Sequence, residues 1–406
     1  MPDDVASAAA AAARDGYGRL VALLAAADGD IDAADDALAD ALERALLSWP
    51  DRGVPDNPHG WLLTVARNRL RDRWKSAEIR RTGPLDVDQH SPVHLDDIDP
   101  DAIPDKRLEL MLVCAHPAIS PTARTPLMLN TVLGFTAEQI ARAFTVPSAT
   151  MATRLVRAKR RIKDIRLPFH VPDRADLPGR MTAVLEAVYG AYVIEWSTAE
   201  AQPRPLPPEA LRLAEILADL VPEDPEVRGL AALVQLSAAR AEARTGPGGE
   251  FVPLDEQDPQ RWDRARIERA HEHLRAAYAR RALGRFQLEA AIQAVHCART
   301  DGSGIDWQTL KTLHTSLQHL APSNGGATAL AAVRAETDGP AAALELLDEV
   351  ADETHRFQPA WATRAHLLAL LGRSDDAVAA YDKAISLTQD AAQRDYLTRR
   401  RAAVVR

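Results

Sequence analysis

Residues 135–163 read FTAEQIARAFTVPSATMATRLVRAKRRIK, and this stretch predicts two helices joined by a tight turn. Thr136 and Gln139 have the spacing of a capping box, so the first helix should start at Thr136. Pro147 disfavours helical geometry at the residue before it, and the first helix should therefore end there. Ser148 is a good N-cap for the second helix. Together these signals predict a helix-turn-helix.

The predicted second helix separates an apolar stripe from a polar and basic surface. Polar and basic side chains near its start suit a major groove, where arginine pairs with guanine and threonine bonds to a base edge or touches a thymine methyl. An ordinary helical hairpin would explain the stripe, but not the capping, the turn and the basic front together. The stripe is Met151, Leu155, Ala158, Ile162 and Ile165. The expected DNA contacts are Ser148, Thr150, Thr153, Arg154 and Arg157, with Lys159, Arg160, Arg161 and Lys163 nearer the phosphates.

Positive charge is concentrated in this part of an acidic chain. The 406 residues have a formal net charge of −9. Residues 106–166 contain 11 Lys and Arg against 3 Asp and Glu, whereas residues 82–105 contain 7 acidic residues and no Lys or Arg. A charge run usually marks a solvated helix face. A basic segment that also carries a helix-turn-helix pattern is more typical of a nucleic-acid contact.

The composition favours an all-α fold and argues against several classes of protein. Hydrophobic residues make up 46% of the chain and aromatic residues only 5%, and alanine is abundant, which favours closely packed helices. Cys114 and Cys297 lie far apart, so neither a disulfide framework nor a zinc site of paired cysteines is expected. The N-terminal alanine run follows acidic residues and is not a secretory signal. No apolar stretch predicts a membrane span, and we expect a cytoplasmic protein.

A second basic segment lies at residues 57–81. Asn57 can cap a helix whose first position suits Pro58. Cations beside an aromatic ring suit unpaired DNA, because bases stack on the ring while phosphates meet arginine. Taken alone, Trp61 and Trp74 fit core positions better than base-stacking platforms. The predicted apolar face is Trp61, Leu62, Val65 and Ala66, and the basic residues include Arg67, Arg69, Arg71 and Arg73.

An acidic amphipathic helix is predicted upstream, where residues 30–50 read DIDAADDALADALERALLSWP. Its acidic side is either a solvated face or a docking surface for a basic partner helix. We expect Leu38, Leu42, Ala45 and Leu46 to face inward, and Asp35, Asp36 and Asp40 to face outward.

The order of these elements over residues 17–166 resembles that of bacterial sigma factors of the extracytoplasmic-function (ECF) type, which keep two domains, sigma-2 and sigma-4. Residues 33–50 resemble the sigma-2 helix that docks on the β′ coiled coil of RNA polymerase. Residues 57–74 resemble the segment that melts and reads the −10 promoter element, and residues 135–162 resemble the sigma-4 helix-turn-helix that reads the −35 element. The resemblance implies a protein that binds promoter DNA and core RNA polymerase, at the β′ coiled coil and the β flap, and that has no catalytic activity.

The resemblance also implies roles for particular residues. Ala152 and Val156 stand where related members carry other side chains, so the promoter sequence cannot be transferred. Pro126 departs from the pattern, and we expect a kink or a late start in the first sigma-4 helix, although Ser120 and Pro121 form a good helix start. The core-binding positions are Asp35, Asp36 and Asp40. Asn68 falls where a flipped −10 base is captured, among Arg67, Arg69, Arg71, Arg73 and Trp74, and Thr153 and Arg157 fall where −35 bases are read.

The sequence predicts four segments. Residues 1–81 form sigma-2, residues 82–105 form an acidic linker with four prolines, residues 106–168 form sigma-4, and residues 169–406 form a helical extension. In the family such a linker passes near the polymerase cleft, and plain disorder is the alternative.

The extension ends in a pattern that suggests tetratricopeptide (TPR) repeats. Ala343, Leu347 and Val350 precede Ala377, Tyr381 and Ala384 by 34 residues each, which is the TPR period. An irregular helical bundle is an equal alternative for residues 180–300. The extension resembles a subgroup of these sigma factors with a C-terminal TPR-like regulatory domain, whose genes often lie near those of small DGPF (YCII-like) proteins, so a partner of that kind is implied. The remaining positions of the TPR pattern are Trp361, Ala365, Leu368 and Gly372.

Two other classes of function compete with a sigma factor. An enzyme is not expected, because the chain has no phosphate-binding glycine loop, nucleophile elbow or paired catalytic carboxylates, and neither a metal nor a cofactor is expected. His271 and His273 do not have the HExxH spacing, and we expect an exposed polar turn there. A free-standing helix-turn-helix regulator with a TPR-like sensor would explain residues 127–166 and 330–390, but not residues 33–74. Such a regulator should bind duplex DNA alone, whereas an acidic sigma factor should bind it poorly without polymerase.

Overall fold

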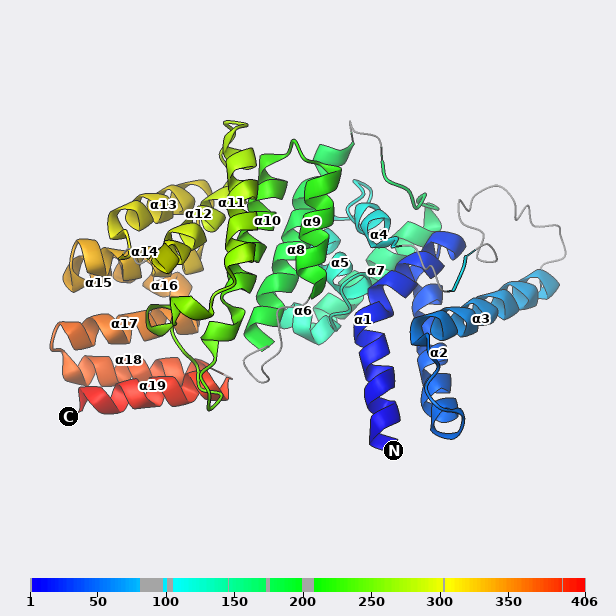
Figure 1. The fold of residues 1–406 in the computed structure, drawn as a ribbon, viewed down its shortest axis with the longest axis horizontal. Helices are drawn as coiled ribbons and strands as arrows, with labels where there is room; N and C mark the ends of the chain where they lie inside the picture. Colours follow the sequence, from blue (N-terminus) through cyan, green and yellow to red (C-terminus); the bar gives the residue numbers. More distant parts are fainter. Residues whose placement is uncertain are drawn as a thin grey trace. The chain divides into compact units, whose positions relative to one another are not determined.

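The protein is almost entirely helical in its computed structural model, which describes residues 2–80, 98–100, 105–144, 146–172, 176–198, 208–301, 304–388 and 390–405. Within these ranges the only β pairing is an isolated bridge between Thr245 and Phe251 (Figure 1). The all-α prediction is therefore confirmed. The chain divides into two compact units, Met1–Ile194 and Glu195–Arg406.

The first unit starts with three helices, α1 (Pro2–Asp28), α2 (Ile31–Arg52) and α3 (Pro58–Arg80). Asp30 caps α2, since its carboxylate accepts a hydrogen bond from the backbone N–H of Ala33. Asn57 caps α3 as predicted, because its side-chain oxygen accepts from the N–H of Gly60. The rings of Trp49 and Trp61 meet edge to face with centroids 5.5 Å apart, which joins the end of α2 to the start of α3.

The buried stripe of α2 differs from the predicted one. Leu38 and Ala45 are buried as expected, and Leu42 is half-buried. Leu46 was predicted to face inward, but its side chain is 49% exposed, and the neighbouring Leu47 is 71% exposed. The prediction for Leu46 is wrong because small alanines let α2 pack closely along a stripe that continues from residue 45 to Trp49 instead.

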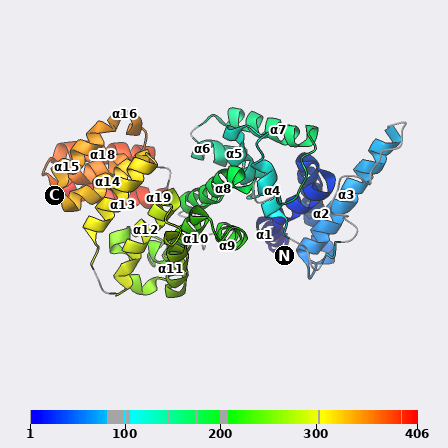
Figure 2. The same ribbon diagram turned by 90° about the horizontal axis from the view of Figure 1, so that it is seen from above.

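The helix-turn-helix lies in a group of four helices, α4 (Arg107–Cys114), α5 (Pro121–Thr131), α6 (Ala137–Ala143) and α7 (Ser148–Asp164) (Figures 1 and 2). Thr136 and Gln139 form the predicted capping box. The predicted stripe of α7 is buried at Met151, Leu155, Ala158 and Ile162, and half-buried at Ile165. The helix-turn-helix prediction is therefore confirmed.

Three details of helix starts depart from expectation. Ser148 is the first residue of α7 and not its cap, because Pro147 occupies the cap position. Ser120 does cap α5 by position, but its hydroxyl bonds to the hydroxyl of Thr122 and makes no bond to the helix backbone. The sequence predicts a kink or a late start at Pro126; the late start does not occur, since α5 begins at Pro121 and runs through a buried Pro126. A proline early in a helix removes only one intrahelical hydrogen bond, and burial of its ring offsets that loss.

Helix α1 lies very close to the end of α5. A Cβ atom built on Gly18 would be 1.8 Å from the carbonyl oxygen of Val132, so only glycine permits this approach. Tyr17 lies beside Gly134 at the same contact. The predicted linker falls largely outside the described residues; of its described part, the carbonyl of Pro100 accepts a hydrogen bond from the Asn57 side chain at 3.0 Å.

Helix α8 (Leu177–Thr198) packs against the helix-turn-helix group through its N-terminal part. Thr125 donates from its hydroxyl to the carbonyl of Ala183 at 3.5 Å, and Arg180 donates to the carbonyl of Leu112 at 3.0 Å. Gly190 lies against the side chain of Leu129. The first compact unit therefore extends past residue 168, where the sequence placed a domain boundary.

The second unit is a succession of helices with short 3-10 turns. Neighbouring helices pack against one another along the chain, and α17, α18 and α19 lie side by side at its C-terminal end (Figure 1). The helices are α9 (Pro208–Leu220), α10 (Pro225–Ala239), α11 (Arg264–Tyr278), α12 (Arg285–Cys297), α13 (Trp307–Leu320), α14 (Asn324–Thr337), α15 (Pro340–Glu349), α16 (Ala351–Thr354), α17 (Gln358–Leu370), α18 (Ser374–Leu387) and α19 (Ala391–Val404). The 3-10 turns include Ala241–Arg244, Leu254–Glu256, Pro259–Arg261 and Ala298–Asp301.

A partly buried polar network joins α9, α10 and α11. Glu215 accepts hydrogen bonds from His273 at 3.0 Å, Gln235 at 2.8 Å and Arg269 at 2.8 Å. Burial would raise the pKa of Glu215, but these donors outweigh it and hold that pKa at about 2. His273 is 1% exposed and belongs to α11, so the prediction of an exposed turn at residues 271–273 is wrong. The charged partner came from another helix, which the local sequence did not reveal.

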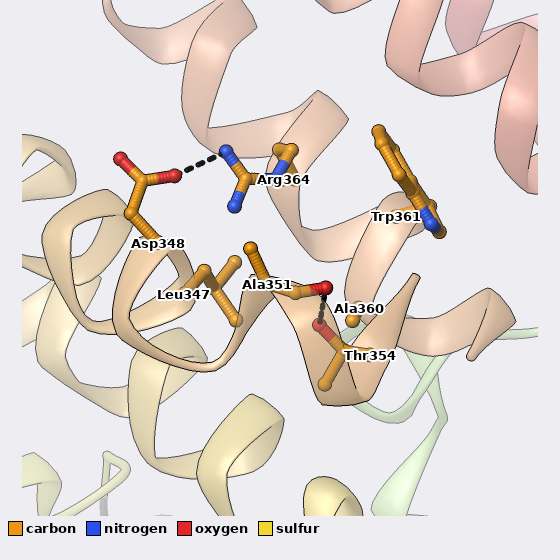
Figure 3. A pocket seen from close by; sticks show the side chains of 7 residues that line it. All are labelled: Leu347, Asp348, Ala351, Thr354, Ala360, Trp361 and Arg364. Carbon is orange, nitrogen blue, oxygen red and sulfur yellow. Dashed lines mark hydrogen bonds and ion pairs between the residues drawn. The ribbon is translucent and has the colours of Figure 1, made fainter. Parts of the chain in front are cut away.

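Most residues of the predicted TPR pattern form one apolar cluster. Ala343, Leu347, Ala365, Leu368, Ala377, Tyr381 and Ala384 are all buried in it, and Trp361 packs against it. Beside the cluster is an open pocket of about 240 Å³, where Arg364 points to Asp348 and bonds to it at 2.6 Å (Figure 3). The TPR-like character of this unit stays a prediction, because burial of these positions also suits an irregular helical bundle.

Candidate nucleic-acid interface

The exposed face of α7 forms one wall of a groove of about 750 Å³. The start of α5 forms the other wall, and Arg154 donates to the carbonyl of Thr122 across it at 3.4 Å. The hydroxyl of Thr153 donates to the carbonyl of Ala149 at 2.9 Å, which leaves its oxygen able to accept from a base. The predicted DNA contacts that line this groove are Thr150, Thr153, Arg154, Arg157 and Arg161.

The other predicted contacts of α7 lie elsewhere. Ser148 and Arg160 are exposed but do not line the groove, and Arg160 pairs with Asp164 at 3.7 Å. Lys159 lies on another side of α7, where its side chain is only 11% exposed and its ammonium group is 2.6 Å from Asp35. The structure therefore separates the predicted contacts. Five of them line an open groove, whereas the side chain of Lys159 is largely covered.

The basic surface of α3 is also divided. Asn68 and Arg69 are exposed, and the side-chain oxygen of Asn68 accepts a hydrogen bond from Arg71 at 3.4 Å. Arg67 is half-buried. Arg69 pairs with Asp40 of α2 at 2.5 Å. Among the predicted −10 residues, Asn68 is therefore exposed, whereas Arg69 forms an ion pair with α2.

Arg73 and Trp74 lie farther along α3, at the turn between α1 and α2. Arg73 pairs with Asp28 at 3.2 Å and with Asp30 at 3.0 Å. The indole N–H of Trp74 donates to Asp28 at 2.5 Å, and the ring is 38% exposed. Trp61, by contrast, is packed on Trp49, so only one of the two tryptophans is a core anchor.

The predicted core-binding aspartates have three different surroundings. Asp36 is exposed, and Asp40 holds Arg69. Asp35 accepts from the hydroxyl of Tyr17 at 2.6 Å as well as from Lys159. Burial and the nearby Asp35 carboxylate raise the pKa of Tyr17, so this hydroxyl remains a donor at physiological pH.

Sequence reasoning missed the carboxylates at the α1–α2 turn. Asp30 accepts from Lys163 at 2.8 Å, and Asp32 lies 3.4 Å from Lys159. Burial would raise the pKa of Asp30, but Lys163, Arg73 and the N–H of Ala33 outweigh it and lower that pKa. Burial raises the pKa of Asp28. The signal that could have identified them is the high density of acidic residues at 28–36, which read DGDIDAADD.

Comparison with known proteins defines the class of this chain. Residues 14–79 match the family model described as Sigma-70 region 2, and residues 109–162 match Sigma-70, region 4. Residues 180–278 match a family of unknown function, DUF6596. The chain therefore belongs to the sigma-70 family.

A relative shares nearly the whole chain. The uncharacterized protein R00370 of Rhizobium meliloti (strain 1021) is 33% identical over 376 residues, which cover 91% of this chain and 89% of that protein. The two proteins thus belong to one family that includes the extension. No solved structure matches this chain.

Sigma-70 regions 2 and 4 identify a sigma factor, which binds core RNA polymerase and promoter DNA and directs promoter-specific initiation of transcription. Sigma factors are not enzymes, and the polymerase carries out the chemistry. Among the described residues, no three histidine, cysteine or acidic side chains are grouped as metal ligands would be. No helix in the described ranges is long and apolar enough to cross a membrane.

Proposed function

We propose that this sigma-70 family member is an alternative sigma factor of the ECF type, whose C-terminal helical extension modulates its activity. The observation that carries the proposal is the pair of matches to regions 2 and 4, with only residues 80–108 between them. So short a connection leaves no room for a further folded domain between the two regions, as expected of a two-domain sigma factor.

In this proposal the groove beside α7 reads the −35 element. Thr153 and Arg157 contact base edges, while Arg154 and Arg161 contact phosphates at the rim of the groove. The groove has the exposure, the positive charge and the position on the second helix of a helix-turn-helix that base reading requires. Residues around the exposed Asn68 on α3 act on the −10 element.

Core polymerase docks on the exposed face of α2. Asp36 supplies negative charge there, and Leu46 and Leu47 add apolar surface farther along the same helix. Exposed leucines beside carboxylates suit a partner helix that carries both basic and apolar side chains, as the β′ coiled coil would. The polymerase flap would contact the region 4 helices.

The extension is the proposed regulatory part. Its TPR-like helices offer an interaction surface, and a small DGPF (YCII-like) protein is the partner that the family resemblance suggests. Run-off transcription by the full chain and by residues 1–198, which retain α8, would give the direction of its effect. Higher activity of the shorter chain would mean that the extension restrains the sigma factor, and lower activity that it assists.

The principal test is run-off transcription with purified core polymerase from the promoter upstream of the chain's own gene. We expect a transcript only when both core polymerase and the chain are present. Arg157→Ala should lower transcription about 5- to 150-fold, since a good base contact contributes roughly 1–3 kcal/mol. Arg356→Ala, which removes an equal charge from an exposed site in the second unit, is the control. Absence of any transcript, with tight duplex binding in the absence of polymerase, would favour the free-standing regulator.

A further inference from the structure

The helices from α13 to α19 start at regular intervals. The first helices of successive pairs start 34 and 33 residues apart, and the second helices start 33 and 34 residues apart. This is the TPR period, and stacked pairs of that kind present a concave face that binds partners. Since each pair repeats the one before it, the first helices share one side of this array. The starts are Asn324, Gln358 and Ala391 for the first helices α14, α17 and α19, and Trp307, Pro340 and Ser374 for the second helices α13, α15 and α18.

The connection between α10 and α11 is far longer than those within the array. Residues 240–263 form it, whereas three residues separate α13 from α14 and two separate α14 from α15. Helix–helix connections in compact domains usually have about 2–8 residues, and a much longer one usually has a function of its own. Residues 245–257, the inserted segment, read TGPGGEFVPLDEQ and turn at Gly249, whose φ is +81°. The contacts of this segment therefore indicate its role.

The inserted segment lies against first helices of the array. The rings of Phe251 and Tyr396 meet edge to face with centroids 5.6 Å apart, and Tyr396 belongs to α19. Arg299 follows α12, the helix paired with α13, and donates to three backbone carbonyls of the segment. The segment thus bridges two first helices that are far apart in the sequence. The carbonyls belong to Leu254 at 2.7 Å, Asp255 at 3.1 Å and Gln257 at 3.2 Å.

The acidic part of the segment lies near cationic groups of α17 and α19. Arg400 of α19 donates to Nδ1 of His366 in α17 at 3.1 Å. Burial would lower the pKa of Arg400, but the surrounding tyrosines and Glu256 outweigh it and raise that pKa. Burial raises the pKa of Tyr396, and Glu256 and Asp255 act in the same direction. Both carboxylates therefore lie close enough to this part of the array to be attracted by Arg400.

The inserted segment is held as peptide ligands are held. Its backbone carbonyls bond to Arg299, which gives affinity for an extended chain, whereas side-chain contacts give selectivity. Residues 251–254 are half-buried, while Asp255 and Glu256 stay exposed. This side of the array therefore suits an aromatic and apolar stretch that is followed by negative charge.

We propose that the inserted segment is a built-in ligand of the binding face formed by Arg299, His366, Tyr396 and Arg400, and that a partner protein displaces it with an extended segment of the same chemistry, an aromatic side chain followed by acidic residues. The inference builds on the proposed regulatory role of the extension and adds the chemistry of its partner. A tethered segment acts at an effective concentration on the order of millimolar, so it excludes weak ligands and admits a partner that makes further contacts.

The first arm of the test measures binding of a fluorescent peptide, GEFVPLDEQ, to the full chain by anisotropy; its sequence is that of residues 249–257. The variant Phe251→Ser, Leu254→Ser weakens the tethered competitor and should bind the peptide at least about tenfold more tightly than the wild type. The control Pro247→Ser, Gln260→Ser changes two exposed residues of the same connection and should bind as the wild type does. Equal affinity of the wild type and the Phe251, Leu254 variant would overturn the proposal.

The second arm locates the peptide on the binding face. A peptide with lysine in place of both acidic residues should bind the Phe251→Ser, Leu254→Ser chain about fivefold more weakly or worse, because Arg400 then repels it. Arg299→Lys in the same chain keeps the charge but loses the fork that reaches three carbonyls, and should lower the affinity roughly 5- to 20-fold. If neither change lowers the affinity, the peptide binds elsewhere and the proposal fails.

Hydrogen exchange of the same variants separates a ligand from a structural brace. We expect α12, α17 and α19 of the Phe251→Ser, Leu254→Ser chain to keep exchange rates within about threefold of the wild type. Faster exchange throughout these helices, without peptide binding, would mean that the segment only braces the array, and would refute the proposal.

Peptide binding is measured without polymerase, so it separates this inference from the proposed function. If the variant binds the peptide but no transcript forms with core polymerase, the binding face exists and the sigma-factor proposal fails. If transcription occurs but peptide binding does not respond to the variants, the chain is a sigma factor without this built-in ligand.

Discussion

The approach of α1 to α5 at Gly18 makes a sharp prediction for Gly18→Ala. The new Cβ would lie 1.8 Å from the carbonyl oxygen of Val132, whereas a carbon and an oxygen in contact need about 3.3 Å. One of the two helices must therefore move by about 1.5 Å. Overpacking of this kind costs roughly 1–3 kcal/mol, and replacing a helical glycine by alanine returns up to about 1 kcal/mol. We therefore expect Gly18→Ala to destabilise the packing of α1 on α5 by about 1–2 kcal/mol.

Hydrogen exchange followed by mass spectrometry can locate this loss in the full chain. Amides of α1 and α5 should exchange about 5- to 30-fold faster in Gly18→Ala, because 1.4 kcal/mol corresponds to a factor of ten. Amides of the second unit should be unchanged. Gly179→Ala is the matched control, since a Cβ at Gly179 in α8 meets no atom within 4 Å.

The reasoning would be refuted if Gly18→Ala retained wild-type protection in α1 and α5. That result would mean that α1 and α5 are not in this contact in solution. Faster exchange throughout the first unit in both glycine variants would instead point to general destabilisation and would equally contradict the prediction.

Three further predictions concern other parts of the chain. Leu47→Ser should weaken binding to core polymerase by about 3- to 30-fold in a pull-down titration and leave the melting temperature unchanged, because this side chain is 71% exposed in the free protein; an unchanged affinity would exclude this face of α2 from the polymerase contact. Glu215→Gln should destabilise the second unit by about 1–3 kcal/mol in urea denaturation, since it weakens the bonds to His273 and Arg269. Because the pKa of Glu215 is held at about 2, below its ordinary value, its contribution to stability is present above about pH 4.5 and is lost as the pH falls toward 2. The difference in free energy of unfolding between wild type and Glu215→Gln should therefore shrink over that range, and a constant difference would contradict this account.

Local signals in the sequence were sufficient for the helix-turn-helix. The capping box of Thr136 and Gln139 and the apolar stripe of α7 depend only on residues within a few positions of one another. The same holds for the cap at Asn57. Such features follow from helix geometry, so the sequence determined the all-α class, the recognition helix and the order of the region 2 and region 4 elements.

The predictions that failed depended on distant parts of the chain. Leu46 fits a helical stripe, but the close packing of alanines selected another stripe of α2. His273 lies in a polar sequence, but Glu215 from another helix made its burial favourable. Pro126 is a poor residue inside an isolated helix, yet burial of its ring holds the helix together. In each case the energy of burial exceeded the local preference.

The distribution of charge likewise has one part that follows from the sequence and another that follows only from the tertiary structure. The sequence by itself determined that α3 and α7 carry positive charge and that residues 28–40 carry negative charge. Only the tertiary structure decided that Lys159 and Lys163 face carboxylates of α2 and its cap, while Arg157 faces the open groove. Neighbouring positions on a helix point about 100° apart, so the packing of α7 on its buried stripe fixes which cations meet carboxylates and which remain available to DNA.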